Sequence, residues 1–166
     1  MLADIAMVSK LILEQRIAYR CLLIASRITR FLAPMWESRY GLSIADWRVL
    51  AVIARYGPLS ATEAATYSST EAFHITRAVD RLIKRRLVKR AIDFSDKRRV
   101  RLNLTTKGRR AHGDIEHVMV RVEAYLLDGI KETDRVGMDN GLVALQERTL
   151  GLIGSTLTWK YFIEMR

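Results

Sequence analysis

The sequence predicts a mainly α-helical protein with a small β-wing, and the spacing of its apolar residues is the main reason. Apolar residues recur every three or four positions over most of the chain, which is typical of amphipathic helices. Near residue 100 the spacing changes to alternation, because Val100, Leu102 and Leu104 are separated by polar residues. Such alternation indicates a half-buried strand. Hydrophobic residues make up 49% of the 166 residues, and only two are prolines, so a substantial core is expected.

A long first helix is expected from about residue 9 to residue 38. Its apolar side chains share one face, with arginines between them. Pro34 should kink or end this helix, because proline lacks the N–H that continues the hydrogen-bond ladder. Gly41 then opens a turn.

Three serines, each followed three residues later by an acidic residue, predict the starts of three shorter helices. These pairs are Ser43 with Asp46, Ser60 with Glu63 and Ser68 with Glu71. Gly57-Pro58 should end the first of the three helices. The predicted helices span residues 44–56, 61–67 and about 68–85, and the last two have the arrangement of a helix-turn-helix.

A β-hairpin with a charged tip should follow directly. The segment from Leu87 to Ile92 is the expected partner of the alternating strand, and residues 93–98 join the two. A hairpin in this place is a wing, so residues 41–104 read as a winged helix-turn-helix.

Two further helices are expected, from Thr105 or Thr106 to about Leu127 and from Thr133 or Asp134 to about Ile153. The apolar tail after Ser155 would rarely be left in water.

The net charge of +10 is concentrated in one quarter of the chain. Residues 71–110 hold fourteen basic and four acidic residues, so they account for the whole excess. Such clustering indicates a polyanion partner, here double-stranded DNA. A solvated basic face, an acidic membrane surface and RNA remain alternatives, and so does non-specific binding of any nucleic acid.

Several function classes find no support in the sequence. There is no glycine-rich phosphate loop, and His112 and His117 are five residues apart, which places them on different faces of a helix. We therefore expect no catalytic residues, no metal site and no cofactor. Cys21 is the only cysteine, and neither a secretory signal nor a long uncharged apolar run is evident. These features predict a cytoplasmic protein without a membrane partner.

The fourth predicted helix carries the candidates for reading DNA bases. Thr70, Phe73, His74 and Arg77 lie on its polar face, near the end that a recognition helix presents to the major groove. Alternatives remain open for three residues of this face. Phe73 could belong to the core, His74 could bind only a phosphate, and Arg81 could brace the domain.

The wing tip concentrates cations on a turn, as is typical of side chains that enter a narrow minor groove. Asp96 is expected to pair with Arg98 or Arg99 and hold its guanidinium in place. An ordinary hairpin with a solvated tip is the alternative. The tip residues are Asp96, Lys97, Arg98 and Arg99.

At this point the chain resembles the MarR family of transcriptional regulators. The matching motifs are GLS at 41–43, WRVL at 47–50, LSATEAA at 59–65, TRAVDRL at 76–82, LVKR at 87–90, DKR at 96–98 and LNLTTKG at 102–108. One departure is the run Arg85-Arg86-Leu87, where the family commonly has glycine in a left-handed cap. A non-glycine residue in that conformation costs roughly 1 kcal/mol.

The resemblance implies a homodimer, usually a repressor, that binds a palindromic operator. Residues 1–40 and 105–166 would then form a helical dimerisation region, and residues 41–104 the winged helix-turn-helix DNA-binding domain. The recognition helix would enter the major groove and the wing the adjacent minor groove. The predicted DNA-binding residues are Ser60, Thr62, Thr70, Phe73, His74, Thr76, Arg77, Arg81, Asp96, Lys97, Arg98 and Arg99.

The resemblance also suggests a small-molecule effector. Relatives often bind aromatic carboxylates or phenols between the dimer layer and the winged domain. Arg16, Trp36, Tyr40 and Arg48 are the predicted lining, with aromatic packing between helices as the alternative. One branch of the family senses hydroperoxides through a cysteine on the first helix, so a redox-responsive regulator acting through Cys21 is a further alternative. The apolar neighbours of Cys21, and the lack of a tyrosine in the turn before the second helix, favour a buried structural cysteine.

Overall fold

The computed structural model describes residues 12–68, 71–92, 100–156 and 158–164. The chain divides into two compact units. We call Ile17–Arg121 the winged unit and Met1–Arg16 with Val122–Arg166 the terminal unit.

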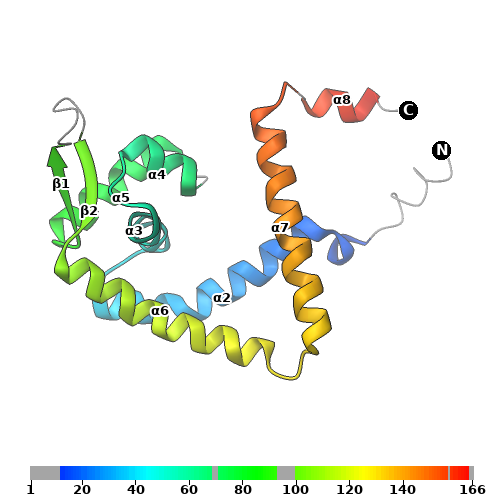
Figure 1. Ribbon diagram of the computed structural model, residues 1–166, viewed down its shortest axis with the longest axis horizontal. Coiled ribbons are helices and arrows are strands. Elements are labelled where there is room, and N and C mark those ends of the chain that lie inside the picture. Colours follow the sequence, from blue (N-terminus) through cyan, green and yellow to red (C-terminus); the bar gives the residue numbers. More distant parts are fainter. Residues whose placement is uncertain (1–11, 69–70, 93–99, 157, 165–166) are drawn as a thin grey trace. The chain divides into compact units, whose positions relative to one another are not determined.

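The described part of the chain is mainly helical, with one two-stranded antiparallel sheet, which confirms the predicted fold class (Figure 1). The winged unit holds α2 (Ile17–Tyr40), α3 (Ile44–Tyr56), α4 (Ala61–Ser68), α5 (Ala72–Lys84), β1 (Val88–Ile92), β2 (Val100–Leu104) and most of α6 (Thr106–Leu127). The terminal unit holds η1 (Leu13–Gln15), the end of α6, α7 (Glu132–Gly154) and α8 (Trp159–Glu164).

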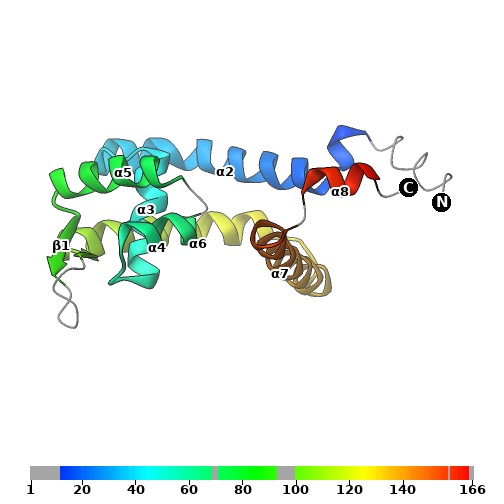
Figure 2. The same cartoon turned by 90° about the horizontal axis from the view of Figure 1, so that it is seen from above.

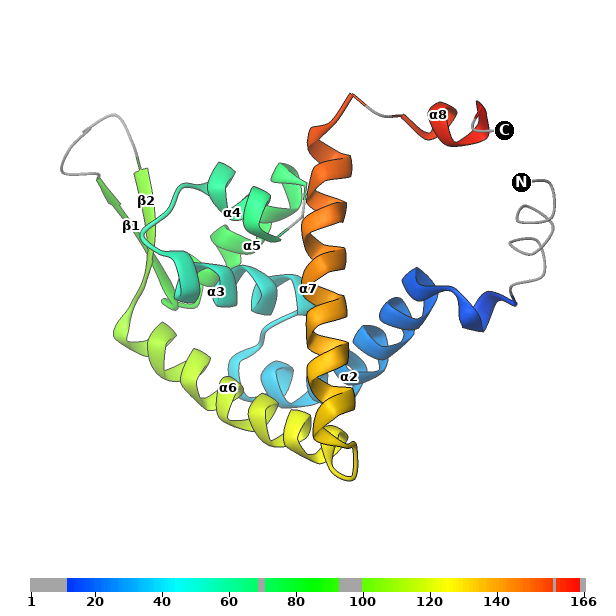
Figure 3. The same cartoon turned by 45° about the vertical axis from the view of Figure 1, so that its right-hand side comes forward.

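Helix α3 is the central element of the winged unit, since it contacts α2, α4, α5 and β2. Figure 2 shows it between α4 and α5, and Figure 3 shows the hairpin beside these helices. Their apolar faces meet at side chains that are at most 2% exposed, among them Leu50, Ile53, Ala64, Ile75 and Leu82. Burial of each large apolar side chain stabilises the fold by roughly 1.5–3 kcal/mol.

Helix α2 does not end at Pro34, so the alternative that this proline ends the helix is wrong. The proline lies inside α2, which continues to Tyr40. The turns around Pro34 carry Leu32 and Trp36, which are 3% and 2% exposed. We attribute the continuation to this packing, which offsets the one lost backbone hydrogen bond. The start also differs: α2 begins at Ile17, and the part of the prediction that falls on residues 9–11 lies outside the described residues.

Two of the three predicted capping boxes are present. Ser43 Oγ accepts from Asp46 N at 3.2 Å, and Asp46 Oδ2 accepts from Ser43 N at 3.0 Å. Ser60 Oγ accepts from Glu63 N at 3.2 Å, and Glu63 Oε2 accepts from Ser60 N at 2.6 Å. Both boxes satisfy backbone donors at helix starts, as the sequence predicted.

The third capping box, predicted at Ser68 and Glu71, is wrong. Ser68 is the last residue of α4, and its Oγ donates to Ala64 O at 2.7 Å. Glu71 occupies the N-cap of α5 without a side-chain capping bond. Serine bonds back to a preceding carbonyl as readily as it caps a helix, which sequence spacing does not distinguish.

Helix α5 ends in a Schellman motif. Leu87 N donates to Leu82 O at 2.9 Å, and Arg86 N donates to Ile83 O at 2.8 Å. Arg86 has a φ of 60°, so it occupies the left-handed position where the family commonly has glycine. The buried side chains of Leu82 and Leu87 hold the turn closed, and this packing offsets the backbone strain.

The wing is tied to three other elements. Its register pairs Val88 with Leu104 and Ile92 with Val100. A bridge joins Leu59 to Leu102, Arg90 pairs with Asp80 of α5 at 2.9 Å, and Arg101 pairs with Glu63 of α4 at 2.7 Å. Residues 93–99 lie outside the described residues.

Many large apolar side chains are exposed on the single chain. The terminal unit exposes Tyr125 by 81%, Ile163 by 69% and Trp159 by 68%, and the first turns of α2 expose Ile17 and Leu22. Among the described residues, no helix is long and apolar enough to cross a membrane. Exposed apolar side chains in such number are typical of an interaction surface.

We predict that the ion pair between Arg81 and Asp46 supports the fold far more than the exposed pair between Arg90 and Asp80. Asp46 is 1% exposed, whereas both partners of the second pair are more than half exposed. Arg81→Met leaves a buried carboxylate without its cation and should lower the free energy of unfolding by about 2–4 kcal/mol. Arg90→Met should cost about 0.5 kcal/mol. Urea unfolding of both variants measures the difference, and equal effects would contradict the prediction.

We predict a pH-dependent contribution from Glu63. Hydrogen bonds from the backbone and hydroxyl of Ser60, then the bond from Arg101, hold the pKa of Glu63 below its ordinary value of 4.5. A depressed pKa gives stability above pH 4.5 that is lost as the pH falls through the lower folded value. Glu63→Gln should therefore lower stability at pH 7 and approach the wild type near pH 3. Glu123→Gln, on an exposed part of α6, is the control. A difference that stays constant from pH 7 to pH 3 would count against this assignment.

Candidate nucleic-acid interface

Helix α5 presents two contrasting faces. Ile75, Ala78, Val79 and Leu82 are at most 2% exposed and pack against the rest of the winged unit. Phe73, His74, Thr76 and Arg77 lie on the exposed side. The predicted division of this helix into a packed face and an outward face is therefore confirmed for the described residues, and Thr70 lies outside them.

Phe73, His74 and Arg77 form one exposed cluster. Phe73 is 63% exposed, so the alternative that it belongs to the core is wrong. Its ring meets the His74 ring edge-to-face, with centroids 5.7 Å apart, and the Arg77 guanidinium carbon lies 4.9 Å from the Phe73 centroid. A cation over an aromatic face gains about 0.5–1 kcal/mol at an exposed site. This contact places the Arg77 guanidinium beside Phe73 on the exposed side of α5.

Arg81 braces the winged unit. Its Nε donates to Asp46 Oδ1 at 2.7 Å, and Asp46 also accepts from the backbone of Ser43. The structure thus shows that Arg81 braces the winged unit, as the alternative for this residue held. A contact between Arg81 and DNA stays a prediction. Its side chain remains 40% exposed.

The start of α4 adds polar groups beside the wing. Thr62 is exposed, and Ser60 is half-buried with its hydroxyl engaged in the capping box. Glu63 links this helix start to Arg101 of β2. The predicted tip residues Asp96, Lys97, Arg98 and Arg99 lie outside the described residues.

Sequence reasoning missed the pairs that position the wing. Glu63–Arg101 and Asp80–Arg90 join residues 38 and 10 positions apart. The Ser60 capping box identified Glu63, but no spacing rule connects it to a strand far along the chain. The structure also stacks Tyr56 on Tyr67, with centroids 4.3 Å apart.

The four predicted effector residues occupy four different settings. Trp36 is 2% exposed and stacks on Trp47, whose other ring neighbour is His112. Its Nε1 is buried and has no hydrogen-bond partner among the described residues. Aromatic packing between helices, the alternative for this position, is what the structure shows for Trp36.

Tyr40 links α2 to α6, because its hydroxyl donates to Asp114 Oδ2. This hydrogen bond is the main cause that raises the pKa of Tyr40, followed by burial and the negative charge of Asp114. Arg16 belongs to the terminal unit and is exposed.

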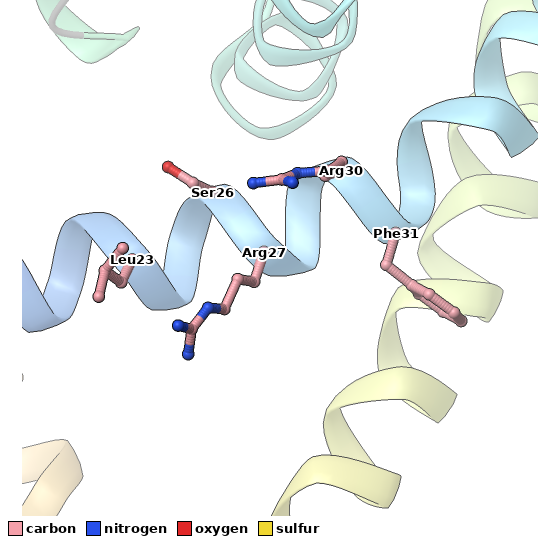
Figure 4. A pocket seen from close by; sticks show the side chains of 5 residues that line it. All are labelled: Leu23, Ser26, Arg27, Arg30 and Phe31. Atoms are coloured by element: carbon pink, nitrogen blue, oxygen red, sulfur yellow. The ribbon is translucent and has the colours of Figure 1, made fainter.

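Arg48 lines a groove between α2 and the start of α3. This groove has apolar walls and two cations, and its lining residues are Leu22, Ala25, Ser26, Thr29, Arg30, Ala33, Ile44 and Arg48. A neighbouring hollow on α2 is lined by Leu23, Ser26, Arg27, Arg30 and Phe31. Figure 4 shows Ser26 and Arg30 on one side of the helix and Arg27 and Phe31 on the other.

Cys21 is exposed on the single chain, so the expectation of a buried cysteine is wrong. Position 21 lies in the part of α2 whose apolar side chains are also exposed. The redox role stays a prediction. No group of three or more histidine, cysteine, aspartate or glutamate residues in the described segments could hold a metal ion.

The sequence is similar to known transcriptional regulators. Residues 40–99 match the sequence model of the MarR family. The chain is also 29% identical over 113 residues to YwoH of Bacillus subtilis (strain 168), described as an uncharacterized HTH-type transcriptional regulator. That alignment covers 68% of this chain and 78% of YwoH.

The fold matches solved structures over most of its length. A MarR-family transcriptional regulator from Silicibacter pomeroyi superposes with a TM-score of 0.73 at 23% identity, covering 90% of this chain and 98% of that one. The S. aureus MepR–DNA complex gives 0.71 at 16% identity, covering 82% and 98%. CouR from Rhodococcus jostii RHA1 bound to p-coumaroyl-CoA gives 0.69 at 21% identity, covering 81% and 94%. The match over residues 40–99, together with the fold, makes this chain similar to the MarR family of transcriptional regulators.

Proposed function

We propose that the protein is a homodimeric repressor that binds a palindromic operator in the cytoplasm. The observation that carries the proposal is the exposed Phe73–His74–Arg77 cluster on α5, a helix whose opposite face is buried. A rigid helix with base-reading side chains on one face suits the major groove of B-DNA. The MepR–DNA complex, which shares this fold, supports the same use of the winged unit.

Each residue of the cluster has a chemical role in the proposal. Arg77 would donate two hydrogen bonds to a guanine edge, and Phe73 would contact a thymine methyl group. His74 would donate to a phosphate. The wing, with Arg98 and Arg99, would enter the adjacent minor groove. Thr62, at the exposed start of α4, would position the winged unit on the DNA backbone.

The apolar side chains left exposed support a homodimer. Most of them lie on the terminal unit and on α2, outside the proposed DNA-binding domain of residues 41–104. Within the described part of that domain the exposed ones are Ile44, Tyr56, Tyr67, Phe73, Ile92 and Val100. A second copy would remove them from water without requiring a different partner. Two-fold symmetry would then place the half-sites about one helical turn, roughly 10 bp, apart.

We further propose an aromatic carboxylate as effector, held in the groove between α2 and α3. Arg48 and Arg30 would bind the carboxylate, and the apolar walls would receive the ring. CouR bound to p-coumaroyl-CoA supports a small-molecule ligand on this fold. Trp36 and Tyr40 pack elsewhere in the present structure, so Arg48 is the residue of the predicted set on which this proposal depends.

We predict that Arg77→Ala weakens operator binding by roughly tenfold to a hundredfold, because a bidentate contact with guanine contributes about 1–3 kcal/mol. Fluorescence anisotropy with an operator selected from random DNA measures this change. Arg121→Ala removes the same charge from an exposed site on α6 and is the matched control. Binding of unrelated DNA should fall much less with Arg77→Ala.

The salt dependence separates this function from general polyanion binding. A specific regulator keeps its preference for the selected operator as salt rises, whereas a non-specific protein loses all binding together. Failure of selection to enrich any sequence, or equal effects of Arg77→Ala on operator and unrelated DNA, would overturn the proposed role.

We predict that Arg48→Ala abolishes the response to aromatic acids. Salicylate and p-coumarate are the probes, and the measurement is the operator affinity of the wild type with and without each acid. Loss of the groove cation should weaken carboxylate binding by about tenfold or more. Arg55→Ala removes an exposed arginine at the other end of α3 and should leave the response unchanged. A wild type insensitive to both acids would reject this effector class while leaving the DNA-binding proposal intact.

A further inference from the structure

The end of α5 is held by the beginning of α6 through a set of bonds that we call the clasp. Three consecutive residues at the end of α5, Arg85 to Leu87, present their carbonyl groups. Thr105 Oγ1 donates to Arg86 O at 2.7 Å, Thr105 N donates to Leu87 O at 3.0 Å, and Lys107 Nζ donates to Arg85 O at 3.1 Å. A helix normally leaves its last carbonyl groups without intrahelical partners. The Schellman motif satisfies Leu82 O and Ile83 O of α5, and the clasp satisfies the carbonyl groups of the three residues that follow the helix.

Thr105 serves both helices at once. A hydroxyl group has one proton to donate and also accepts. The proton points to Arg86 O, with Leu87 O farther away at 3.2 Å, while the oxygen accepts from Gly108 N at 3.0 Å. The same side chain therefore caps the start of α6 and ties it to the end of α5.

Gly108 sets how closely the two elements approach. A Cβ atom at this position would lie 1.9 Å from Leu87 O, so a larger residue would force the helices apart. Thr105 is half-buried, and Gly108 and Leu87 are buried. Because the backbones of Gly108 and Leu87 lie so close together, α5 has little freedom to tilt against α6.

We propose that the clasp is a specificity element that fixes the spacing between half-sites which the protein accepts in its operator. This inference rests on the proposed binding of a palindrome by a homodimer. Helix α6 continues from the clasp out of the winged unit as far as Leu127, into the region proposed to dimerise. If the joint between α5 and α6 is rigid, the dimer fixes the distance between its two recognition helices. A loose joint lets each winged unit adjust to its own half-site.

Half-site spacing is a sensitive measure of this rigidity. Inserting one base pair at the centre of the operator moves the half-sites apart by about 3.4 Å and rotates them by about 35°. A rigid dimer cannot follow this change without losing contacts or deforming the DNA. The ratio of affinities for the selected spacing and for spacings changed by one base pair therefore measures the freedom of α5.

Variants of the full-length protein separate the clasp from helix capping. Thr105→Asp keeps an acceptor for Gly108 N and removes the proton that binds Arg86 O, so it preserves the cap and breaks the clasp. Thr105→Ser keeps both functions and should behave as the wild type. Lys107→Met removes the bond from Lys107 Nζ to Arg85 O. Matched controls are Thr106→Val, an exposed threonine beside the clasp, and Arg121→Met, which loses a charge on the same helix.

The experiment compares three operators, with the selected spacing and with one central base pair added or removed. If the wild type prefers its own spacing by about a hundredfold, Thr105→Asp combined with Lys107→Met should reduce this preference to about tenfold or less. The Thr105→Ser, Thr106→Val and Arg121→Met variants should keep it. Circular dichroism and sedimentation confirm that each variant is folded and has the oligomeric state of the wild type.

The outcomes are distinguishable. A wild type that binds no operator specifically fails the proposed function itself. A wild type that discriminates between spacings, with a folded clasp variant that discriminates equally well, overturns the clasp proposal alone. If the double variant does not fold, Lys107→Met is compared by itself, and an unchanged preference then counts against the proposal.

Discussion

The buried carboxylate of Asp46 is the constraint on which the winged unit depends. It accepts the backbone N–H of Ser43, which starts α3, and the Nε–H of Arg81, which belongs to α5. At 1% exposure, this charge is tolerated only because both bonds are made. The carboxylate of Asp46 therefore fixes α3 and α5 to each other. The exposed face of α5 can carry polar side chains, because the bond to Asp46, and not that face, fixes the position of the helix.

Sequence reasoning predicted the elements well where local chemistry decides them. The capping boxes at Ser43 and Ser60, the stop at Gly57 and the paired strands are all local patterns, and they are present in the structure. The polar face of α5 followed from helical periodicity. The left-handed position at Arg86 could be anticipated from the family pattern, although the residue there is not glycine.

Predictions were wrong or incomplete where tertiary contacts decide. Pro34 is a helix breaker by local chemistry, but the packing of Leu32 and Trp36 keeps α2 continuous. The pair of Glu63 with Arg101 depends on how α4 lies beside β2, which no local rule contains. Trp36 and Tyr40 share a helix face, yet one stacks on Trp47 and the other bonds Asp114. The roles of Thr70 and of residues 96–99 stay predictions.

The stacked pair of Trp36 and Trp47 gives the protein a built-in optical reporter. Both indoles are at most 7% exposed and belong to the winged unit, whereas Trp159 is 68% exposed in the terminal unit. Buried indoles emit at shorter wavelength than hydrated ones, so the three tryptophans form two spectral populations. Emission at the red edge of the spectrum thus reports the surroundings of Trp159 in α8. Emission at the blue edge reports the stack where α2, α3 and α6 meet, which also includes the imidazole ring of His112.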